Sequence, residues 1–297
     1  MAINLFQKLL KAHNPKSTGE QTAAKASLFD LDLNRLQFVL NNSTLENKNE
    51  LYRRALEKLK TQAENHPSDG EVVYALASHL FYLESGDKAA NAKTAVAELE
   101  AAIRRHADTF GGLRCQQLLA QIKTPSLNST VEQVNLPDQN ILVQLNFRNL
   151  KKVWVKVVKD DFNQDERAQY DDQWFEALNT ARPIQSKTWE IQDPGDYQTH
   201  LTEIALDGLP FGNYWVLIAE NSDFKSKGSP LNYANFTVSN LAAVNYNELG
   251  TARFVLANRN SGTPLAGVKL DFFKTDYESG RPKFQSIGAT TSDRDGL

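Results

Sequence analysis

The chain has 297 residues, a formal net charge of -3, 41% hydrophobic residues and 23% charged residues. These are ordinary proportions for a globular protein, and the length allows two or three domains. The small negative charge provides no whole-protein attraction for nucleic acid or for an anionic membrane. The single cysteine, Cys115, excludes an internal disulfide and a thiolate metal cluster within this chain.

Residues 1–22 are predicted to be a flexible N-terminus. They are too polar for a secretory signal, and no apolar run in the chain approaches the roughly 18 to 20 residues of a membrane span. We therefore expect no membrane span here. An exported protein would carry its signal or lipid anchor outside this sequence.

Residues 23–124 predict a helical domain, because they are rich in strong helix formers and Pro67 is the only proline from Ala23 to Ile122. Leu51, Ala55 and Leu59, flanked by Tyr52 and Leu56, recur at helical spacing and predict one apolar stripe. Ser68 or Asp69 can cap the next helix. Further helices are expected at about 72–86, 90–106 and 112–122.

Two similar stretches, beginning at Tyr52 and Ala95, lie about 43 residues apart and resemble tetratricopeptide-type helical hairpins. Such hairpins either form a peptide-binding groove or serve as a packing module, and packing is the simpler interpretation. Cys115 is predicted to be a buried structural thiol. His66 is expected to interact with a helix C-terminus, and His79 to be a core or groove residue.

Residues 137–238 predict an antiparallel β-sandwich of about seven strands, preceded by a linker over 125–136. The first two strands, 141–147 and 153–158, are expected to form a hairpin through 148–152. The polar segment 160–178 predicts an inserted helix or a long loop. Further strands are expected at 188–192, 197–206, 213–219 and 233–238.

All four tryptophans lie between Trp154 and Trp215 and predict an aromatic core in this domain. Around Leu209–Val216, Gly212 provides backbone freedom at a corner, and Tyr214 is expected to pack where the next strand begins. Residues 239–297 predict part of a second sandwich, with strands near 253–258 and from about Gly267. We expect an incomplete domain that packs on the first one or pairs its open edge with a neighbouring molecule.

The order of these motifs resembles a known family. Val143–Asn149, Val153–Val157, Leu209–Val216, Phe236–Leu241 and the later Thr263–Val268 and Thr290–Gly296 are similar to the N-terminal macroglobulin domains of bacterial alpha-2-macroglobulin proteins, particularly those of Bacteroidetes. The resemblance implies a large envelope protein of tandem macroglobulin domains that entraps proteases at the periplasm or cell surface. The family's thioester motif, Cys-Gly-Glu-Gln, is not matched at Cys115, which is followed by Gln116 and Gln117.

No catalytic, cofactor-binding or metal-binding residues are predicted. Asp293 and Asp295 could contribute to a calcium loop, but an ordinary turn between strands is the simpler interpretation. The carboxylates at 160–161, 165–166 and 171–172 lie in a polar segment with nothing to separate their pKa values, so a solvated loop is favoured over a glycosidase site. No nucleophile elbow, phosphate-binding loop, zinc-protease motif or dinucleotide fingerprint occurs.

Two functions are compatible with these observations. The first is a non-enzymatic N-terminal piece of an alpha-2-macroglobulin-like envelope protein, whose partners are the downstream macroglobulin domains of the same parent chain and the target proteases. The second is a surface module that binds a peptide or glycan and is linked to outer-membrane uptake. No nucleic-acid partner is expected.

Overall fold

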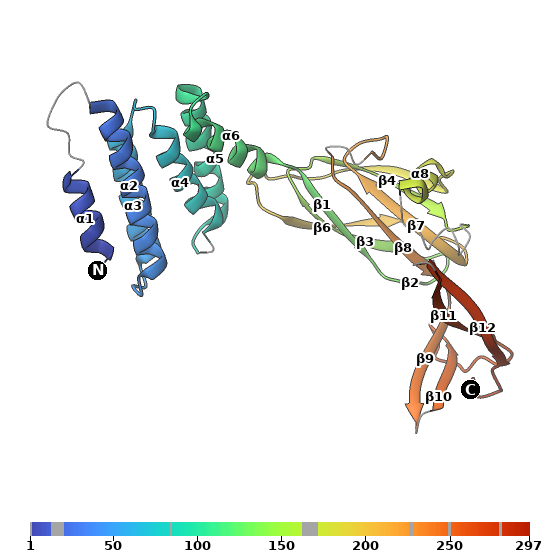
Figure 1. The fold of residues 1–297 in the computed structure, drawn as a ribbon. Helices are drawn as coiled ribbons and strands as arrows, with labels where there is room; N and C mark the ends of the chain where they lie inside the picture. The colour runs from blue at the N-terminus through green and yellow to red at the C-terminus, as the bar shows by residue number, and fades with distance from the viewer. Residues whose placement is uncertain are drawn as a thin grey trace. The chain divides into compact units, whose positions relative to one another are not determined.

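The computed structural model describes residues 2–12, 21–83, 85–161, 172–225, 229–248, 251–278 and 281–297. They divide into two compact units, Met1–Thr124 with Asp193–Thr199 and Pro125–Gln192 with His200–Leu297. The first unit is helical and the second is built from β-sheets, whose long strand pairs are all antiparallel (Figure 1). The predicted fold class, a helical part followed by antiparallel β-structure, is confirmed.

The described helices of the first unit follow one another with short connections. They are α1 (Ala2–Ala12), α2 (Gln21–Asn42), α3 (Lys48–Ala63), α4 (Asp69–Tyr82), α5 (Lys88–His106) and α6 (Phe110–Lys123). Within the N-terminus that is predicted to be flexible over 1–22, Ala2–Ala12 form the helix α1, and its Phe6 packs on Phe38 of α2 with ring centroids 5.9 Å apart. Residues 13–20 lie outside the described part of the chain.

One apolar core joins α2, α3, α4, α5 and α6. On α3 the buried face differs slightly from the predicted apolar stripe. Tyr52, Leu56, Leu59 and Ala63 are buried, whereas Leu51, predicted to lie in the stripe, is 44% exposed. From α4 the buried residues Val72, Val73, Leu76 and Leu80 enter the same core, and Val96 and Leu99 enter it from α5, as predicted.

Two helix N-termini approach one another closely in this unit. A Cβ atom built on Gly111 of α6 would lie 2.5 Å from the carbonyl carbon of Gly70 in α4, and one built on Gly70 would lie 2.7 Å from the carbonyl carbon of Gly111. The two backbones are therefore in direct contact, and a side chain at either position would have no room.

The second unit contains a sandwich of a three-stranded and a five-stranded sheet. The strand orders are β1-β3-β6 and β2-β8-β7-β4-β5, and only the short pair β2 and β8 is parallel. The strands are β1 (Ser126–Val131), β2 (Val134–Asn135), β3 (Ile141–Arg148), β4 (Lys152–Lys159), β5 (Gln185–Glu190), β6 (His200–Leu206), β7 (Gly212–Ala219) and β8 (Leu231–Val238).

The predicted hairpin between 141–147 and 153–158 is wrong. The two strands, β3 and β4, belong to different sheets, and β3 pairs with β1 and β6 while β4 pairs with β5 and β7. Leu150 in the connection is 1% exposed and belongs to the core between the sheets. Burial of this side chain favours a crossing from one sheet to the other over a solvent-exposed turn.

The predicted linker over 125–136 is also wrong, because β1 and β2 lie within it. Polar residues dominate β1, which is an edge strand paired on one side only, with β3. An edge strand with one partly solvated face needs little apolar patterning, and this accounts for the missed assignment.

Both faces of the five-stranded sheet are covered. Val153, Val155 and Val157 face the core between the sheets, as predicted. The opposite face is covered by α8 (Asp172–Thr180), within the segment where an inserted helix or loop is predicted. Trp174 of α8 packs edge-on against Trp215 of β7 at 4.9 Å, which gives this face the expected aromatic core.

The corner before β7 forms as predicted around Tyr214. This side chain is 1% exposed, and its hydroxyl donates a hydrogen bond to the carbonyl oxygen of Pro210 at 2.8 Å. Its ring lies close against Gly212, where a Cβ atom would be 3.1 Å from the Tyr214 hydroxyl. A tyrosine that hydrogen-bonds the backbone a few residues upstream is the corner device of immunoglobulin-like sandwiches.

The remaining described strands form two separate hairpins. The first pairs β9 (Leu241–Glu248) with β10 (Thr251–Asn258), and the second pairs β11 (Lys269–Glu278) with β12 (Arg281–Thr291). Gly267 lies in the turn before β11 rather than in the strand. Within the described residues these four strands form no closed sheet sandwich of their own.

Candidate functional site

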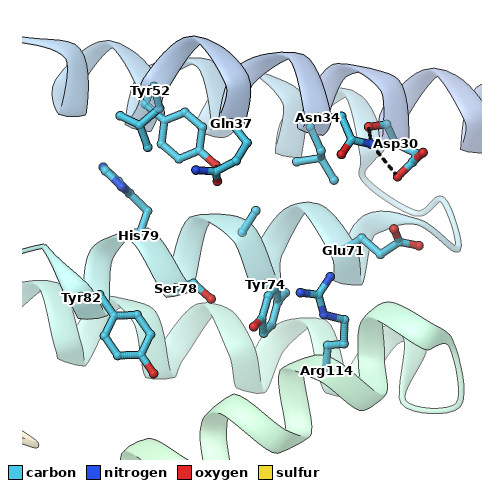
Figure 2. Close-up of a pocket in the computed structure, with 13 residues that line it drawn as sticks. Asp30, Asn34, Gln37, Tyr52, Glu71, Tyr74, Ser78, His79, Tyr82 and Arg114 are labelled. Atoms are coloured by element: carbon cyan, nitrogen blue, oxygen red, sulfur yellow. Dashed lines mark hydrogen bonds between the residues drawn. The ribbon is translucent and has the colours of Figure 1, made fainter. Parts of the chain in front are cut away.

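The strongest candidate site is a groove in the helical unit, with a volume of about 490 Å³. This lies within the roughly 300 to 1,000 Å³ that is usual for ligand pockets. Side chains from α2, α3, α4 and α6 line it (Figure 2). The lining residues are Asp30, Leu33, Asn34, Gln37, Leu40, Tyr52, Glu71, Tyr74, Ala75, Ser78, His79, Tyr82 and Arg114.

Helical periodicity explains why polar side chains gather in this groove. On α2, Asp30, Asn34 and Gln37 follow at spacings of four and three residues and occupy one face. On α4, Tyr74 and Ser78 follow Glu71 at spacings of three and four, and Tyr74 lies beside Arg114 of α6 (Figure 2). The apolar residues of α4 face the core instead, so the groove is a polar face that the packing of the helices leaves open.

His79 lies in this groove, as predicted for a core or groove residue. Its Nε2 is 3.1 Å from the carbonyl oxygen of Asn49, and its ring meets that of Tyr52 edge-on at 4.9 Å. Burial lowers the pKa of His79, so the imidazole is neutral near pH 7 and donates from Nε2 to that carbonyl. The Tyr52 hydroxyl in turn donates to Oε1 of Gln37 at 3.0 Å. These contacts hold the wall of the groove in place.

The other end of the groove is charged. Burial raises the pKa of the Glu71 carboxyl, the nearby charge of Asp30 raises it further, and Arg114 opposes both. The Arg114 guanidinium carbon lies 3.8 Å from the ring centroid of Tyr74. Between the two ends, the Ser78 hydroxyl oxygen is buried and forms no hydrogen bond with any residue that the structure describes. A buried polar group without a partner is uncommon and indicates a place where a ligand or water can bind.

The sequence alone did not identify Asp30, Glu71 or Arg114 as site residues. The available signal was the polar spacing on α2, opposite the apolar positions that enter the core. The polar spacing on α2 indicates a site only once α2 is known to pack beside α4, and long-range packing decides that arrangement.

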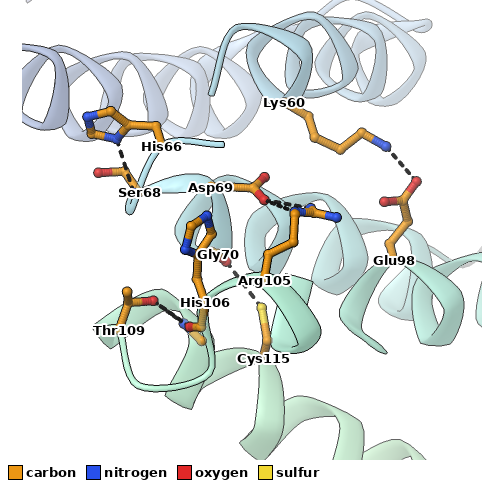
Figure 3. Close-up of polar contacts among 11 residues, drawn as sticks. Lys60, His66, Ser68, Asp69, Gly70, Glu98, Arg105, His106, Thr109 and Cys115 are labelled. Atoms are coloured by element: carbon orange, nitrogen blue, oxygen red, sulfur yellow. Dashed lines mark hydrogen bonds and ion pairs between the residues drawn. The ribbon is translucent and has the colours of Figure 1, made fainter. Parts of the chain in front are cut away.

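Cys115 is a buried structural thiol, as predicted. It is 0% exposed, its Sγ donates to the carbonyl oxygen of Gly70 at 3.2 Å, and burial raises its pKa to about 12 (Figure 3). A thiol with this pKa is almost entirely protonated at neutral pH and is a poor nucleophile. Cys115 therefore belongs to the packing between α4 and α6.

The turn between α3 and α4 is held by His66. The backbone amide of Ser68 donates to Nδ1 of His66 at 3.1 Å, and the backbone amide of His66 donates to the carbonyl oxygen of Ala63 at the end of α3. Ser68 occupies the N-cap position of α4, as predicted for one of the two candidates, but its side chain makes no capping hydrogen bond, and Asp69 is the first residue of the helix. The Asp69 carboxylate instead accepts from Nε of Arg105 at 2.7 Å and from its Nη2 at 2.5 Å (Figure 3).

Of the carboxylates considered in the sequence, those that the structure describes lie in no group that could hold a metal ion. Oδ1 of Asp293 accepts the backbone amides of Asp295 and Leu297, each at 2.9 Å, and so holds a local turn. Asp161 pairs with Lys159 at 3.1 Å, while the pairs at 165–166 and 171–172 include residues outside the described part of the chain. In the described ranges no group of three or more His, Cys, Asp or Glu side chains could hold a metal ion.

None of the described helices combines the length and apolar character needed to cross a membrane.

Comparison with known proteins gives distant likenesses. No family model and no curated protein matches the chain. A solved structure of native alpha-2-macroglobulin from Escherichia coli, spanning domains NIE-MG1, is 17% identical with a TM-score of 0.37, and the match covers 59% of this chain and 85% of that one. A structure spanning domains MG0-NIE-MG1 of the same protein is 15% identical with a TM-score of 0.37, covering 58% of this chain and 56% of that one. The surface layer protein SbsC, domains 1–6, is 13% identical with a TM-score of 0.22, covering 98% of this chain and 42% of that one.

Proposed function

We propose that this chain is a non-catalytic N-terminal part of a bacterial alpha-2-macroglobulin-like envelope protein, where it acts as scaffold and interaction surface for a protease-trapping body. The observation that carries the proposal is the succession of a helical unit, a two-sheet sandwich and a further pair of β-hairpins along one chain. Its supporting details are the ordered motifs of the sequence and the corner built on Tyr214.

In this function the chain works mechanically. Sandwich domains in tandem pack into a body whose shape changes when a protease cuts a bait segment, and the helical unit and first sandwich provide surfaces for that packing. The partners are the downstream macroglobulin domains of the parent and its target proteases, at the periplasm or cell surface. The chemistry of inhibition lies outside these residues.

The test uses the full-length parent protein with a broad-specificity protease. Cleavage should give a stable complex or a compaction measured by small-angle scattering. The same protease with its active site blocked is the control, and it should give neither. If active protease digests the parent without a complex and without compaction, the proposal is wrong.

A second function, peptide binding by the helical unit, is favoured by the groove between α2 and α4. Its lining offers side-chain amides, a partnerless hydroxyl and an arginine, which suit the carbonyl and amide groups of an extended peptide better than an apolar packing surface would. Selection from a library of short peptides on the whole chain tests it. Asn34→Trp, which fills the groove from α2, should abolish binding, and Gln117→Trp, at an exposed position of α6 outside the lining, should not.

A further inference from the structure

Two carboxylates lie at one end of the groove, and the one cation of the described lining beside them, Arg114, forms a salt bridge with neither. Asp30 comes from α2 and Glu71 from α4, and both line the groove (Figure 2). Among the described residues neither forms an ion pair, and the side chain of Asp30 accepts only from the Nδ2 of Asn34, at 3.2 Å. Bringing two like charges together is unfavourable, so this end of the groove favours a positively charged ligand group.

Next to these carboxylates lie hydrogen-bond donors that have no acceptor. The guanidinium of Arg114 is held over the Tyr74 ring and makes no hydrogen bond to any described residue. An arginine presents five N–H donors, so all of them remain open to a ligand. The buried Ser78 hydroxyl lies further along α4 and likewise has no hydrogen-bond partner in the described part of the chain. The groove therefore has places for carbonyl oxygens beside its place for a cation.

The net charge of the lining also favours a cationic ligand. Asp30 and Glu71 outweigh Arg114, and His79 is neutral because burial lowers its pKa, so the groove carries one net negative charge. One ligand cation restores neutrality. An acidic ligand would meet two carboxylates at close range and would be repelled.

Resting on the peptide-binding role of the groove, we propose that its occupant is an extended peptide segment that contains a lysine or arginine. The side-chain cation lies between the carboxylates of Asp30 and Glu71. Neighbouring peptide carbonyl oxygens accept hydrogen bonds from Arg114 and from the Ser78 hydroxyl. Specificity for a basic side chain then comes from Asp30 and Glu71, while Arg114 and Ser78 bind the peptide backbone.

The experiment is a selection on the whole chain from random peptides with acetylated N-termini and amidated C-termini, so that a terminal amine cannot supply the cation. Lysine and arginine should be enriched among the bound peptides. Changing the enriched basic residue to glutamine should weaken binding about tenfold or more, the loss expected for a charge-assisted hydrogen bond. Raising the salt concentration should weaken it as well.

Variants then locate the cation. Asp30→Asn should weaken the basic peptide by about the same factor, and it should leave the glutamine peptide unchanged. Glu71→Gln should act likewise. The matched control is Asp32→Asn, which removes the same charge from α2 at a residue that pairs with Arg35 at 2.8 Å outside the groove lining. Circular dichroism confirms that each variant is folded, and Asp30 is exposed enough for its variant to fold in any case.

The outcomes distinguish the proposal of a basic peptide from the proposal that the groove binds peptides at all. Peptides without basic preference that are still blocked by Asn34→Trp would overturn the basic ligand and leave peptide binding standing. A separately prepared peptide without lysine or arginine that binds with a free N-terminal amine, and no longer binds once acetylated, would also overturn it. A selection that enriches no peptide, or a groove that binds only oligosaccharides, would overturn peptide binding itself.

Discussion

The close approach of α4 and α6 makes Gly111 a sensitive position for stability. In Gly111→Ala the added Cβ atom would lie 2.5 Å from the carbonyl carbon of Gly70 and closer still to the backbone amide nitrogen of Glu71. Ordinary contacts between carbon atoms lie at about 3.5 to 4.0 Å, so the two helices must separate by roughly 1 Å. The obstacle is backbone, which cannot turn aside as a flexible side chain can.

The expected cost follows from two opposing effects. Overpacking of a close-packed interface costs about 1 to 3 kcal/mol. Alanine gains at most about 1 kcal/mol over glycine in a helix, and less in the first turn, where Gly111 lies. The net loss for Gly111→Ala is therefore about 1 to 2 kcal/mol in the free energy of unfolding. For a unit of this size it should lower the melting temperature by roughly 5 to 10 °C.

The chain provides separate signals for its two units. All four tryptophans, Trp154, Trp174, Trp189 and Trp215, belong to the β-unit, while the long helices belong to the other. Circular dichroism at helical wavelengths therefore follows the unit that contains Gly111. Tryptophan fluorescence follows the β-unit and should give the same transition in wild type and variant.

Two further variants sharpen the test. Leu113→Ala, at a residue of α6 that is 50% exposed, should change stability little. Gly70→Ala should destabilise the unit as Gly111→Ala does, and the double variant should lose less than the sum, because one separation of the helices makes room for both methyl groups. A Gly111→Ala variant that melts at or above the wild-type temperature would refute the direct backbone contact.

Three other predictions concern single groups. Tyr214→Phe removes the hydrogen bond to the Pro210 carbonyl and should lower the stability of the β-unit by about 1 kcal/mol, measured by urea unfolding with tryptophan fluorescence. Because the pKa of Glu71 is raised above its ordinary value of 4.5, its ionised form destabilises the fold. Stability of the helical unit should therefore fall as pH rises from 4.5 through the raised pKa, and Glu71→Gln should flatten that decline in melts followed by circular dichroism. Cys115, with a pKa of about 12, should react with iodoacetamide at pH 8 about a thousandfold more slowly in the native chain than in denaturant, and equal rates would contradict its burial.

Much of the fold could be predicted from local sequence patterns. Helix formers at three-to-four spacing predicted the helices around Leu56, Leu76 and Leu99, and alternation along Val153, Val155 and Val157 predicted which face of β4 enters the core. These features depend on neighbours a few residues away, where the period of the backbone decides which side chains share a face.

Strand pairing was harder to predict. The edge strand β1 was missed because pairing with β3, rather than its own composition, makes it a strand. The prediction of a hairpin through Leu150 is wrong because a short polar turn and a short crossing between sheets have similar sequences. The difference lies in what covers Leu150, which is the core contributed by both sheets.

The sequence by itself determined the helical and β-parts of this protein, the burial of Cys115 and the corner at Tyr214, because each follows from residues close together in the chain. Only the tertiary structure decided the groove. Glu71 lies 41 positions after Asp30 in the chain, and Arg114 lies a further 43 positions along. Their meeting depends on how α2, α4 and α6 pack, and burial of the apolar faces of those helices, rather than any preference of the charged residues, leaves the polar faces turned toward one another.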